Sequence, residues 1–480
     1  MPISVRIGVT VATLVLLSIF GNVYAISSII WSWPLPSGLS VDTGTLVPDR
    51  TFVMSDGVIA IGSAPCPQKP WLCTNTAIYP STQAFWALDA NTGKVKWTIP
   101  LPNGSVIRPV AGNQKLMIAE YSGNDHQGTA SWKTLALDAQ TGHIVWGIPR
   151  PNWSGDPLLA GNIVVTPDEM NPGNWMNPDP TLTAYDSSSG NLLWRIHTAP
   201  IESAPVAYGS GMIFAPGGQV GSYKGNMLTA YDASSGAMKW NREGLLSEGG
   251  ACPTYMSGIV FVKQALQSQA SVETVNLIAL NALSGQTVWN KTIGYSWAGS
   301  GTPESSVLFP CPMISDGRLF VLSDKAPYQV LPNLVALNPA DGRELWRHTF
   351  PCEQDPLNIS ACRQEAWNHQ ALSNSTLFMS AGFLYGIDTT TGTTTWTDGV
   401  TADNWNPLAY VAGVLYALNT PNGFSPVLSA FAISISPIPE MPTGTAVWIL
   451  GVVLLGAQLF VMRNLRVSDK KRKSSTDKHW

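Results

Sequence analysis

One eleven-residue unit recurs seven times along the chain and constrains its fold more than any other feature. The first copy, ALDANTGKVKW, ends at Trp97, and the others end at Trp146, Trp194, Trp240, Trp289, Trp346 and Trp396. Every copy has an Asp or Asn, a Gly four residues later and a Trp four residues after that. Chance does not produce seven gapless copies, so the chain is a repeat protein.

Each copy is typical of a β-hairpin. Alternating apolar residues before the Asp or Asn, as in 333–337, predict a half-buried strand. The Asp or Asn, Ser or Thr and Gly then predict a tight turn, because the side-chain oxygen accepts turn amides and Gly adopts a positive φ. Further strands upstream, as in 312–322, bring each period of about 50 residues to four strands, which is one blade of a β-propeller.

The two ends of the repeat region give the number of blades. The segment WSWPLPSG, which starts at Trp31, is similar to WTIPLPNG, which starts at Trp97. Residues 28–34 are therefore predicted to form a fourth, outer strand that has no other strands of its blade beside it in the sequence. Residues 408–433 predict three strands with no Trp after them. We therefore expect an all-β, eight-bladed β-propeller whose ring is closed by the N-terminal strand, leaving no free sheet edge. The side chains expected to dock between blades are Trp31, Trp97, Trp146, Trp194, Trp240, Trp289, Trp346 and Trp396.

The unit resembles the tryptophan-docking repeat of the PQQ-like (quinoprotein alcohol dehydrogenase-like) eight-bladed propellers, named for pyrroloquinoline quinone. The resemblance covers about residues 28–433. The family includes PQQ-dependent dehydrogenases of alcohols and sugars. It also includes binding members without the quinone, such as the lipoprotein of the bacterial outer-membrane barrel-assembly machine. The resemblance therefore implies the fold, whereas activity depends on the site.

In a propeller of this kind, ligands are expected at the mouth of the central channel, on the loops that follow each Trp. PQQ would need an aromatic face, a Ca²⁺ ion held by oxygen ligands and a carboxylate base. The candidates for such a site are Glu365, Trp367, Asn368, Asp403, Trp405 and Asn406. The same loops also carry Trp153, Asp156, Glu202, Glu248, Trp297, Glu304 and Asn404.

Two departures from the family's alcohol dehydrogenases count against a quinone enzyme. Those enzymes have two adjacent cysteines over the quinone, and this chain has no Cys-Cys pair. It also has no Cys-x-x-Cys-His motif for covalent haem. We therefore expect no cofactor, with PQQ and Ca²⁺ as the alternative.

The six cysteines suit an oxidising compartment. Two pairs each lie within one loop and favour local disulfides: Cys66 with Cys73, and Cys352 with Cys362. Cys252 and Cys311 occupy equivalent positions before the first strand of consecutive blades, and His369 holds about that position in the next blade. A Cys252–Cys311 disulfide is the favoured interpretation; a copper or zinc site formed with His369 is the alternative.

The two ends of the chain predict its topology. Residues 1–25 contain Arg6, then an apolar run ending in a small residue, which indicates a signal peptide or, alternatively, an uncleaved anchor. Residues 445–462 lie in a run without charge that is long enough for a transmembrane helix. The basic tail, 463–480, is then expected in the cytoplasm. A sequence similar to archaeal three-part sorting signals, Pro437–Pro442 before the span, leaves clipping of the span as an alternative.

These boundaries predict a single-pass protein of the cell membrane, with the propeller (26–436) outside and a linker at 437–444. Only 2 of the 31 acidic residues, but 8 of the 27 basic residues, lie in the terminal segments, so the portion between them is acidic and should repel nucleic acid. Sequons in that portion fit an extracellular glycoprotein; they begin at Asn103, Asn152, Asn290, Asn358 and Asn374.

The function expected from the sequence is a binding or scaffold module for an envelope protein, a glycan or a small ligand at the channel mouth. The alternatives are a PQQ-dependent dehydrogenase and a metal-binding surface protein.

Overall fold

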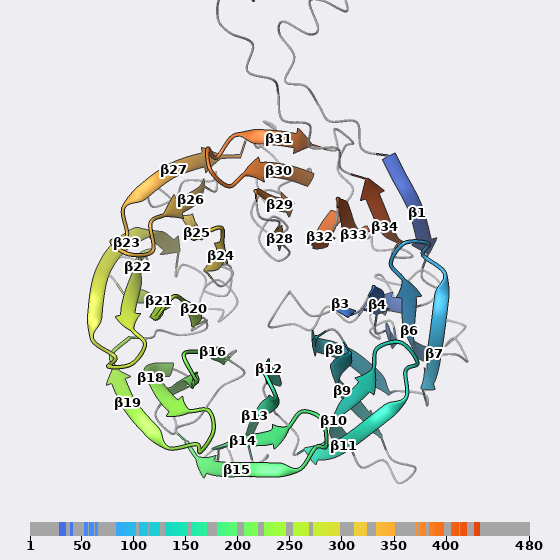
Figure 1. The fold of residues 1–480 in the computed structure, drawn as a ribbon. Coiled ribbons are helices and arrows are strands. Elements are labelled where there is room, and N and C mark those ends of the chain that lie inside the picture. The colour runs from blue at the N-terminus through green and yellow to red at the C-terminus, as the bar shows by residue number, and fades with distance from the viewer. Residues whose placement is uncertain are drawn as a thin grey trace, which may run out of the picture. The chain divides into compact units, whose positions relative to one another are not determined.

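Eight four-stranded antiparallel sheets surround one axis in the computed structural model (Figure 1). This arrangement confirms the predicted all-β, eight-bladed β-propeller. The structure describes residues 28–34, 39–41, 52–55, 57–61, 63–65, 83–101, 105–113, 115–124, 130–150, 156–169, 180–198, 206–218, 225–245, 253–267, 272–297, 312–323, 333–350, 370–372, 375–380, 384–397, 405–411, 413–419 and 427–432.

No helix that could span a membrane is found among these described residues. The expected signal peptide (1–25), linker (437–444), transmembrane helix (445–462) and basic tail (463–480) all lie outside them.

Blades 1 to 7 run in chain order from an innermost first strand to an outermost fourth strand, and in blade 8 the outermost strand is β1 (Figure 1). Blades 1 to 4 are β3 (Phe52–Ser55), β4 (Val58–Ile61), β6 (Gln83–Asp89) and β7 (Val95–Leu101); β8 (Val106–Gly112), β9 (Leu116–Asn124), β10 (Ala130–Asp138) and β11 (Ile144–Arg150); β12 (Leu158–Ala160), β13 (Ile163–Glu169), β14 (Pro180–Asp186) and β15 (Leu192–His197); β16 (Ala207–Gly209), β17 (Met212–Gly218), β18 (Gly225–Asp232) and β19 (Met238–Glu243).

Blades 5 to 7 are β20 (Thr254–Met256), β21 (Ile259–Gln267), β22 (Val272–Asn281) and β23 (Thr287–Trp297); β24 (Met313–Ser315), β25 (Arg318–Ser323), β26 (Asn333–Leu337) and β27 (Glu344–Thr349); β28 (Gln370–Leu372), β29 (Thr376–Ser380), β30 (Leu384–Asp388) and β31 (Thr394–Thr397). Blade 8 contains β32 (Trp405–Val411), β33 (Val414–Asn419), β34 (Val427–Ala432) and β1 (Ser28–Pro34). A separate two-stranded antiparallel sheet consists of β2 (Leu39–Val41) and β5 (Ser63–Pro65).

The N-terminal strand β1 is the outer strand of blade 8, as the sequence predicts. It pairs antiparallel with β34, from Ser28 opposite Ala432 to Pro34 opposite Val427. Within this pair Trp31 lies opposite Ala430, as Trp146 lies opposite Ala136 in blade 2. The small residue leaves room for the indole, so β1 occupies the same register as the fourth strand of an ordinary blade.

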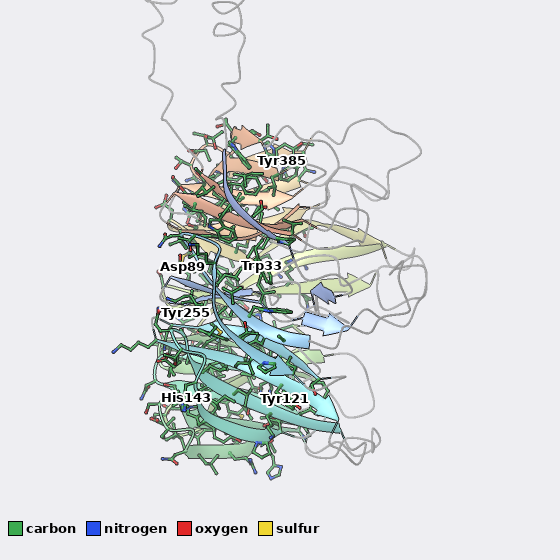
Figure 2. All side chains as sticks on the ribbon, turned by 90° about the vertical axis from the view of Figure 1, so that its right-hand side faces the viewer. Trp33, Asp89, Tyr121, His143, Tyr255 and Tyr385 are labelled. Atoms are coloured by element: carbon green, nitrogen blue, oxygen red, sulfur yellow. The ribbon has the colours of Figure 1, made fainter. Side chains whose placement is uncertain are left out.

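The ring has two different faces. The first and third hairpin turns of blades 1 to 7 lie on one face, which we call the turn face; there, for example, the Ala90 amide donates to the Gly57 carbonyl. Fourth strands end on the opposite face, and the connections to the next blade begin there, so we call it the loop face. Figure 2 shows Asp89 and His143 at the turn face and Tyr121 closer to the loop face.

The hydrophobic core lies in the gaps between blades. In one gap, for example, Phe261 and Leu277 of blade 5 pack against Leu319 and Val321 of blade 6. Seven tryptophans also bridge these gaps, because each indole Nε1–H donates to a backbone carbonyl in the turn of the next blade. The bonds, 2.8–3.0 Å long, join Trp31 to Ala90, Trp97 to Ala139, Trp146 to Ser187, Trp194 to Ala233, Trp240 to Ala282, Trp289 to Pro339, and Trp346 to Thr389.

Trp396, at the boundary between blades 7 and 8, differs from the other seven. It is only 1% exposed, yet its Nε1–H has no hydrogen-bond partner among the described residues. In the other blades the acceptor carbonyl follows the third strand, and the residues that follow β34 lie outside the described part of the chain.

Three successive blades add a second contact across the gap, two residues after the docking Trp. Arg242 Nη1 donates to the Gly285 carbonyl, Lys291 Nζ to the Gly342 carbonyl and His348 Nδ1 to the Gly392 carbonyl, each at 2.9 Å. His348 therefore carries its proton on Nδ1, while Nε2 is buried and none of the described residues forms a hydrogen bond with it. Burial lowers the pKa of His348, and the bond to Gly392 opposes that shift only in part.

Acid should destabilise the protein partly through His348. Because its folded pKa lies below the unfolded value of about 6.5, the unfolded chain binds the extra proton first, and stability falls as the pH drops below that value. His348→Asn keeps an N–H donor for Gly392 but does not titrate, so it should flatten the pH dependence of the free energy of unfolding between about pH 7 and 5. Urea titrations at several pH values measure this, and an equal slope in His348→Asn and the unchanged protein would show that other groups cause the acid sensitivity.

Candidate functional site

Most of the side chains expected at the channel mouth lie outside the described residues. These are Glu365, Trp367, Asn368 and Asp403, the expected metal ligands Cys252, Cys311 and His369, and the cysteines Cys66, Cys73, Cys352 and Cys362. Trp153, Glu202, Glu248, Glu304 and Asn404 also lie outside them. The disulfides, the metal site and the main part of the PQQ site therefore remain predictions.

Four of the expected residues are placed at least in part. Trp405 and Asn406 begin β32, the innermost strand of blade 8, and pair with Asn419 and Leu418. Asp156 lies just before β12 at the loop face and is buried. Trp297 was expected in a loop, but it is the last residue of β23 and pairs with Val272, because that outer strand extends well beyond its docking Trp.

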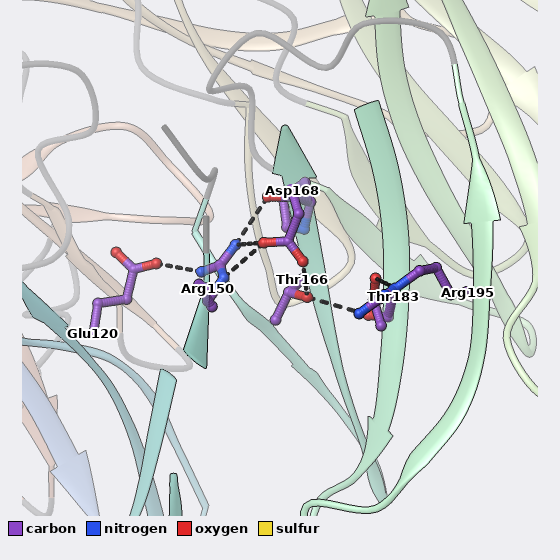
Figure 3. A network of polar contacts seen from close by, with 7 residues as sticks. Glu120, Arg150, Thr166, Asp168, Thr183 and Arg195 are labelled. Carbon is purple, nitrogen blue, oxygen red and sulfur yellow. Dashed lines mark hydrogen bonds and ion pairs between the residues drawn. The ribbon is translucent and has the colours of Figure 1, made fainter. Parts of the chain in front are cut away.

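The described residues contain a buried ion network near the loop face, between blades 2 and 3 (Figure 3). Arg150, at the end of β11, lies between two carboxylates. Its Nη1 contacts Glu120 of β9 at 2.5 Å, and its Nε donates to Asp168 of β13 at 2.7 Å. Its Nη2 donates to the Pro167 carbonyl at 2.9 Å, and the Thr166 hydroxyl donates to the other oxygen of Asp168 at 2.9 Å.

The repeat explains how these side chains reach one gap. Arg150 stands four residues after the docking Trp146, so it points into the gap toward blade 3. No other blade places a charged residue there, and several place an apolar one, such as buried Ile293 and Phe350. Superimposing the repeats would have singled out Arg150 as the charged exception, and our sequence analysis missed this signal.

The gap between blades 2 and 3 is thus divided in two. Toward the turn face it holds a small apolar cluster of Ile118, Ala136, Trp146 and Val164. Toward the loop face it holds the ion network. Two threonine hydroxyls there, Thr134 opposite Glu120 and Thr181 opposite Asp168, are buried and have no hydrogen-bond partner within the part of the chain that the structure describes.

A second buried charged residue lies in blade 5, at the strand position that Glu120 occupies in blade 2. Lys263 of β21 is 7% exposed, and it follows Phe261 on the side of the strand that packs against blade 6. Burial lowers its pKa to about 7. An amine with such a pKa is partly uncharged at neutral pH, where it can accept a proton or act as a nucleophile.

The ion network mainly has a structural role. Both carboxylates are engaged by one guanidinium, which matches their planar geometry and holds two blades together. No group of three or more His, Cys, Asp or Glu side chains suited to a metal ion occurs in the part of the chain that the structure describes. The network thus stiffens the ring directly beneath the loop face.

Comparison with known proteins supports the fold. A family model described as outer membrane protein assembly factor BamB (PQQ_2) matches residues 86–252, 244–404 and 332–433. No curated protein matches the chain in sequence. Quinohemoprotein alcohol dehydrogenase from Comamonas testosteroni is 13% identical over 88% of this chain and 78% of that chain, with a TM-score of 0.52. The corresponding enzyme ADHIIG from Pseudomonas putida HK5 is 13% identical over 87% and 78%, with a TM-score of 0.51.

BamB from Moraxella catarrhalis is 16% identical over 85% of this chain and 100% of that chain, with a TM-score of 0.45. At these identities the solved structures are similar to this chain in fold alone. The family model, in contrast, extends over well more than half of the sequence. The chain therefore belongs to the PQQ_2 family of BamB-like propellers.

Proposed function

We propose that this chain is a membrane-tethered platform that docks a protein of the cell envelope on its loop face. The contrast between the two faces carries the proposal. Turns on the turn face are short and nearly identical, with an Asp or Asn side chain that accepts the amides of the next residues, as Asp89 does at 2.9 Å from Thr92. Connections that begin on the loop face differ in length and sequence, from 102–105 to the long segments 298–312 and 350–369.

Connections of this length in a compact domain are usually functional. Binding residues are commonly placed on loops that a rigid scaffold holds in position. The ion network of Arg150 and the inter-blade bonds of the tryptophans supply that rigidity. The description of the matching family as an outer membrane protein assembly factor favours a protein partner over a glycan or a small ligand. The uncharged run at 445–462 supports the tether.

Photo-crosslinking in the native membrane tests the docking face. p-Benzoylphenylalanine would replace Glu243, exposed at the loop-face end of β19, or Ser235, exposed in the turn of the same blade. Glu243 should yield a discrete protein adduct and Ser235 should not, because only the first lies at the loop face. Equal adducts at both positions would contradict the proposal, and a glycan adduct at Glu243 would identify a different ligand class.

The dehydrogenase alternative has a separate test in solution. Adding PQQ with Ca²⁺ to the purified full chain should leave the melting temperature unchanged and give no saturable change in quinone absorbance. Any ligand that binds only the folded state raises the melting temperature, so the measurement is sensitive to weak binding. A saturable rise in the melting temperature would support the dehydrogenase alternative, and alcohols and sugars would then be the substrates to examine.

A further inference from the structure

The outer strand of blade 5 carries an asparagine for which the fold has no use. Asn290 directly follows the docking Trp289 in β23, and it lies opposite Ile278 of β22. Figure 1 shows β23 on the outside of the ring. The side chain of Asn290 is exposed and forms no hydrogen bond with any residue that the structure describes. Neither packing nor polar contacts therefore explain why an asparagine stands here.

The sequence around Asn290 gives this side chain a possible chemistry. Asn290, Lys291 and Thr292 form the pattern in which a Ser or Thr stands two residues after an Asn, with a residue other than Pro between them. This pattern is the acceptor of N-linked glycans. The other four asparagines that begin such a pattern lie outside the described residues, so Asn290 is the acceptor whose surroundings are defined.

The threonine of this pattern has a structural role of its own. Thr292 Oγ1 donates to Asn276 Oδ1 at 2.8 Å. The corresponding pair in blade 6 is the same, since Thr349 Oγ1 donates to Asn333 Oδ1 at 2.6 Å. The repeat thus accounts for the threonine but leaves Asn290 unexplained.

The wall of the ring has room for a bulky group at this position. The residue that directly follows the docking Trp is exposed in blades 1 to 5; these residues are Thr98, Gly147, Arg195, Asn241 and Asn290. The position accepts side chains from none, in Gly147, to the long one of Arg195. A group attached to the amide of Asn290 would therefore extend into solvent without displacing a neighbouring blade.

A glycan at Asn290 would also cover an exposed strand edge. β23 has 11 residues, which makes it the longest of the described strands, and it is the last strand of its sheet. The outer edge of such a strand can pair with a strand of another chain. A bulky hydrophilic group attached to this strand would hinder that pairing.

We propose that Asn290 carries an N-linked glycan. Its donor is a lipid-linked oligosaccharide: Asn290 Nδ2 forms a bond to C1 of the first sugar, the bond between C1 and the phosphate oxygen breaks, and the lipid phosphate leaves while the amide loses one proton. The transfer would precede the pairing of β23 with β22, because Thr292 Oγ1 is engaged by Asn276 in the folded blade. The proposal rests on the position of the propeller outside the cytoplasm, which the proposed function requires.

Peptide mass spectrometry of the full chain isolated from its native membrane tests the modification. The peptide that contains Asn290 should carry an added glycan mass, and fragmentation that keeps the sugar attached should place it on Asn290. Asn241 is the matched control, because it is exposed at the same repeat position but Glu243 stands where the pattern needs a Ser or Thr. An unmodified Asn290 peptide, or equal modification at Asn241, would overturn the proposal.

Three variants separate this glycan from a sugar attached chemically to the adjacent lysine. Asn290→Gln should remove the glycan mass from the intact protein and leave the melting temperature unchanged. Thr292→Ser keeps the hydroxyl, and Lys291→Arg keeps the acceptor pattern, so both should retain the glycan. Loss of the added mass in Lys291→Arg, but not in Asn290→Gln, would place the sugar on the lysine amine and refute the modification of Asn290.

The failures of the two proposals are distinguishable. A membrane-impermeant amine reagent added to intact cells should label Lys239, whose side chain is 47% exposed on the outer strand of blade 4. A labelled Lys239 with an unmodified Asn290 refutes the glycan alone. An unlabelled Lys239 refutes the position outside the cytoplasm, and with it both proposals. Protein crosslinking from Glu243 reports separately on the docking face.

Discussion

Replacing Arg150 with methionine should lower the free energy of unfolding by about 3–5 kcal/mol, the usual cost of removing one partner from a buried ion pair. The side chains of Glu120, Arg150 and Asp168 are only 3–6% exposed, so water cannot replace the lost guanidinium. Two carboxylates would then remain buried across the gap without this guanidinium. Urea denaturation monitored by tryptophan fluorescence would measure the loss.

Two companion variants separate charge from packing. Arg195→Met removes an exposed arginine of the adjacent blade, whose Nε donates to Thr183 Oγ1 at 3.2 Å, and should cost under about 1 kcal/mol. Adding Glu120→Gln and Asp168→Asn to Arg150→Met should recover much of the lost stability, because no buried charge is left unpaired. Equal effects of Arg150→Met and Arg195→Met would show that the network contributes no more than an exposed contact.

Replacing Trp240 with alanine should cost about 3–5 kcal/mol, as expected for a large aromatic packed in a core. Its indole packs on Phe214 with ring centroids 6.0 Å apart and donates to the Ala282 carbonyl of the next blade at 2.8 Å. Truncation removes both contacts and leaves a void between blades 4 and 5. An unchanged melting temperature would refute the docking role of this side chain.

A pair of glycine variants probes the same contact from the other blade. Gly285 has a φ of +68°, and a Cβ there would lie 2.7 Å from Cδ2 of Trp240. Gly258 has a φ of +84° with no atom within 4 Å of its Cβ position. Both alanine variants strain the backbone, but only Gly285→Ala displaces the indole, so it should be the more destabilising. Equal melting temperatures would mean that the turn yields without disturbing Trp240.

The repeat made the architecture predictable because every copy encodes the same hairpin. The Asp or Asn, the Gly and the Trp each have one local role, and the short similarity after Trp31 and Trp97 was enough to identify β1 as the missing outer strand. Such reasoning treats all copies as equivalent, whereas Trp396 differs from the other seven in having no hydrogen-bond partner among the described residues.

The ion network could be predicted only in part. Arg150 is visible as the charged exception at its repeat position, but its partners come from different strands and blades. Asp168 and Glu120 occupy different strand positions, opposite Thr181 and Thr134, and they meet at Arg150 only because blades 2 and 3 pack face to face. Such a meeting depends on the geometry of the gap rather than on a spacing along the chain.

The pairing of β1 with β34 has a mechanical consequence. The hydrogen bonds of this pair and the packing of Trp31 and Trp33 close the ring, and Ser28 and Ala432, where the chain enters and leaves, lie opposite each other at the same end of the pair. A force that pulls Ser28 away from Ala432 would break the hydrogen bonds of this pair one after another from that end, rather than load them all at once in shear. The ring would yield at this pair under a weak pull, and it could close again from the same end once the pull stopped.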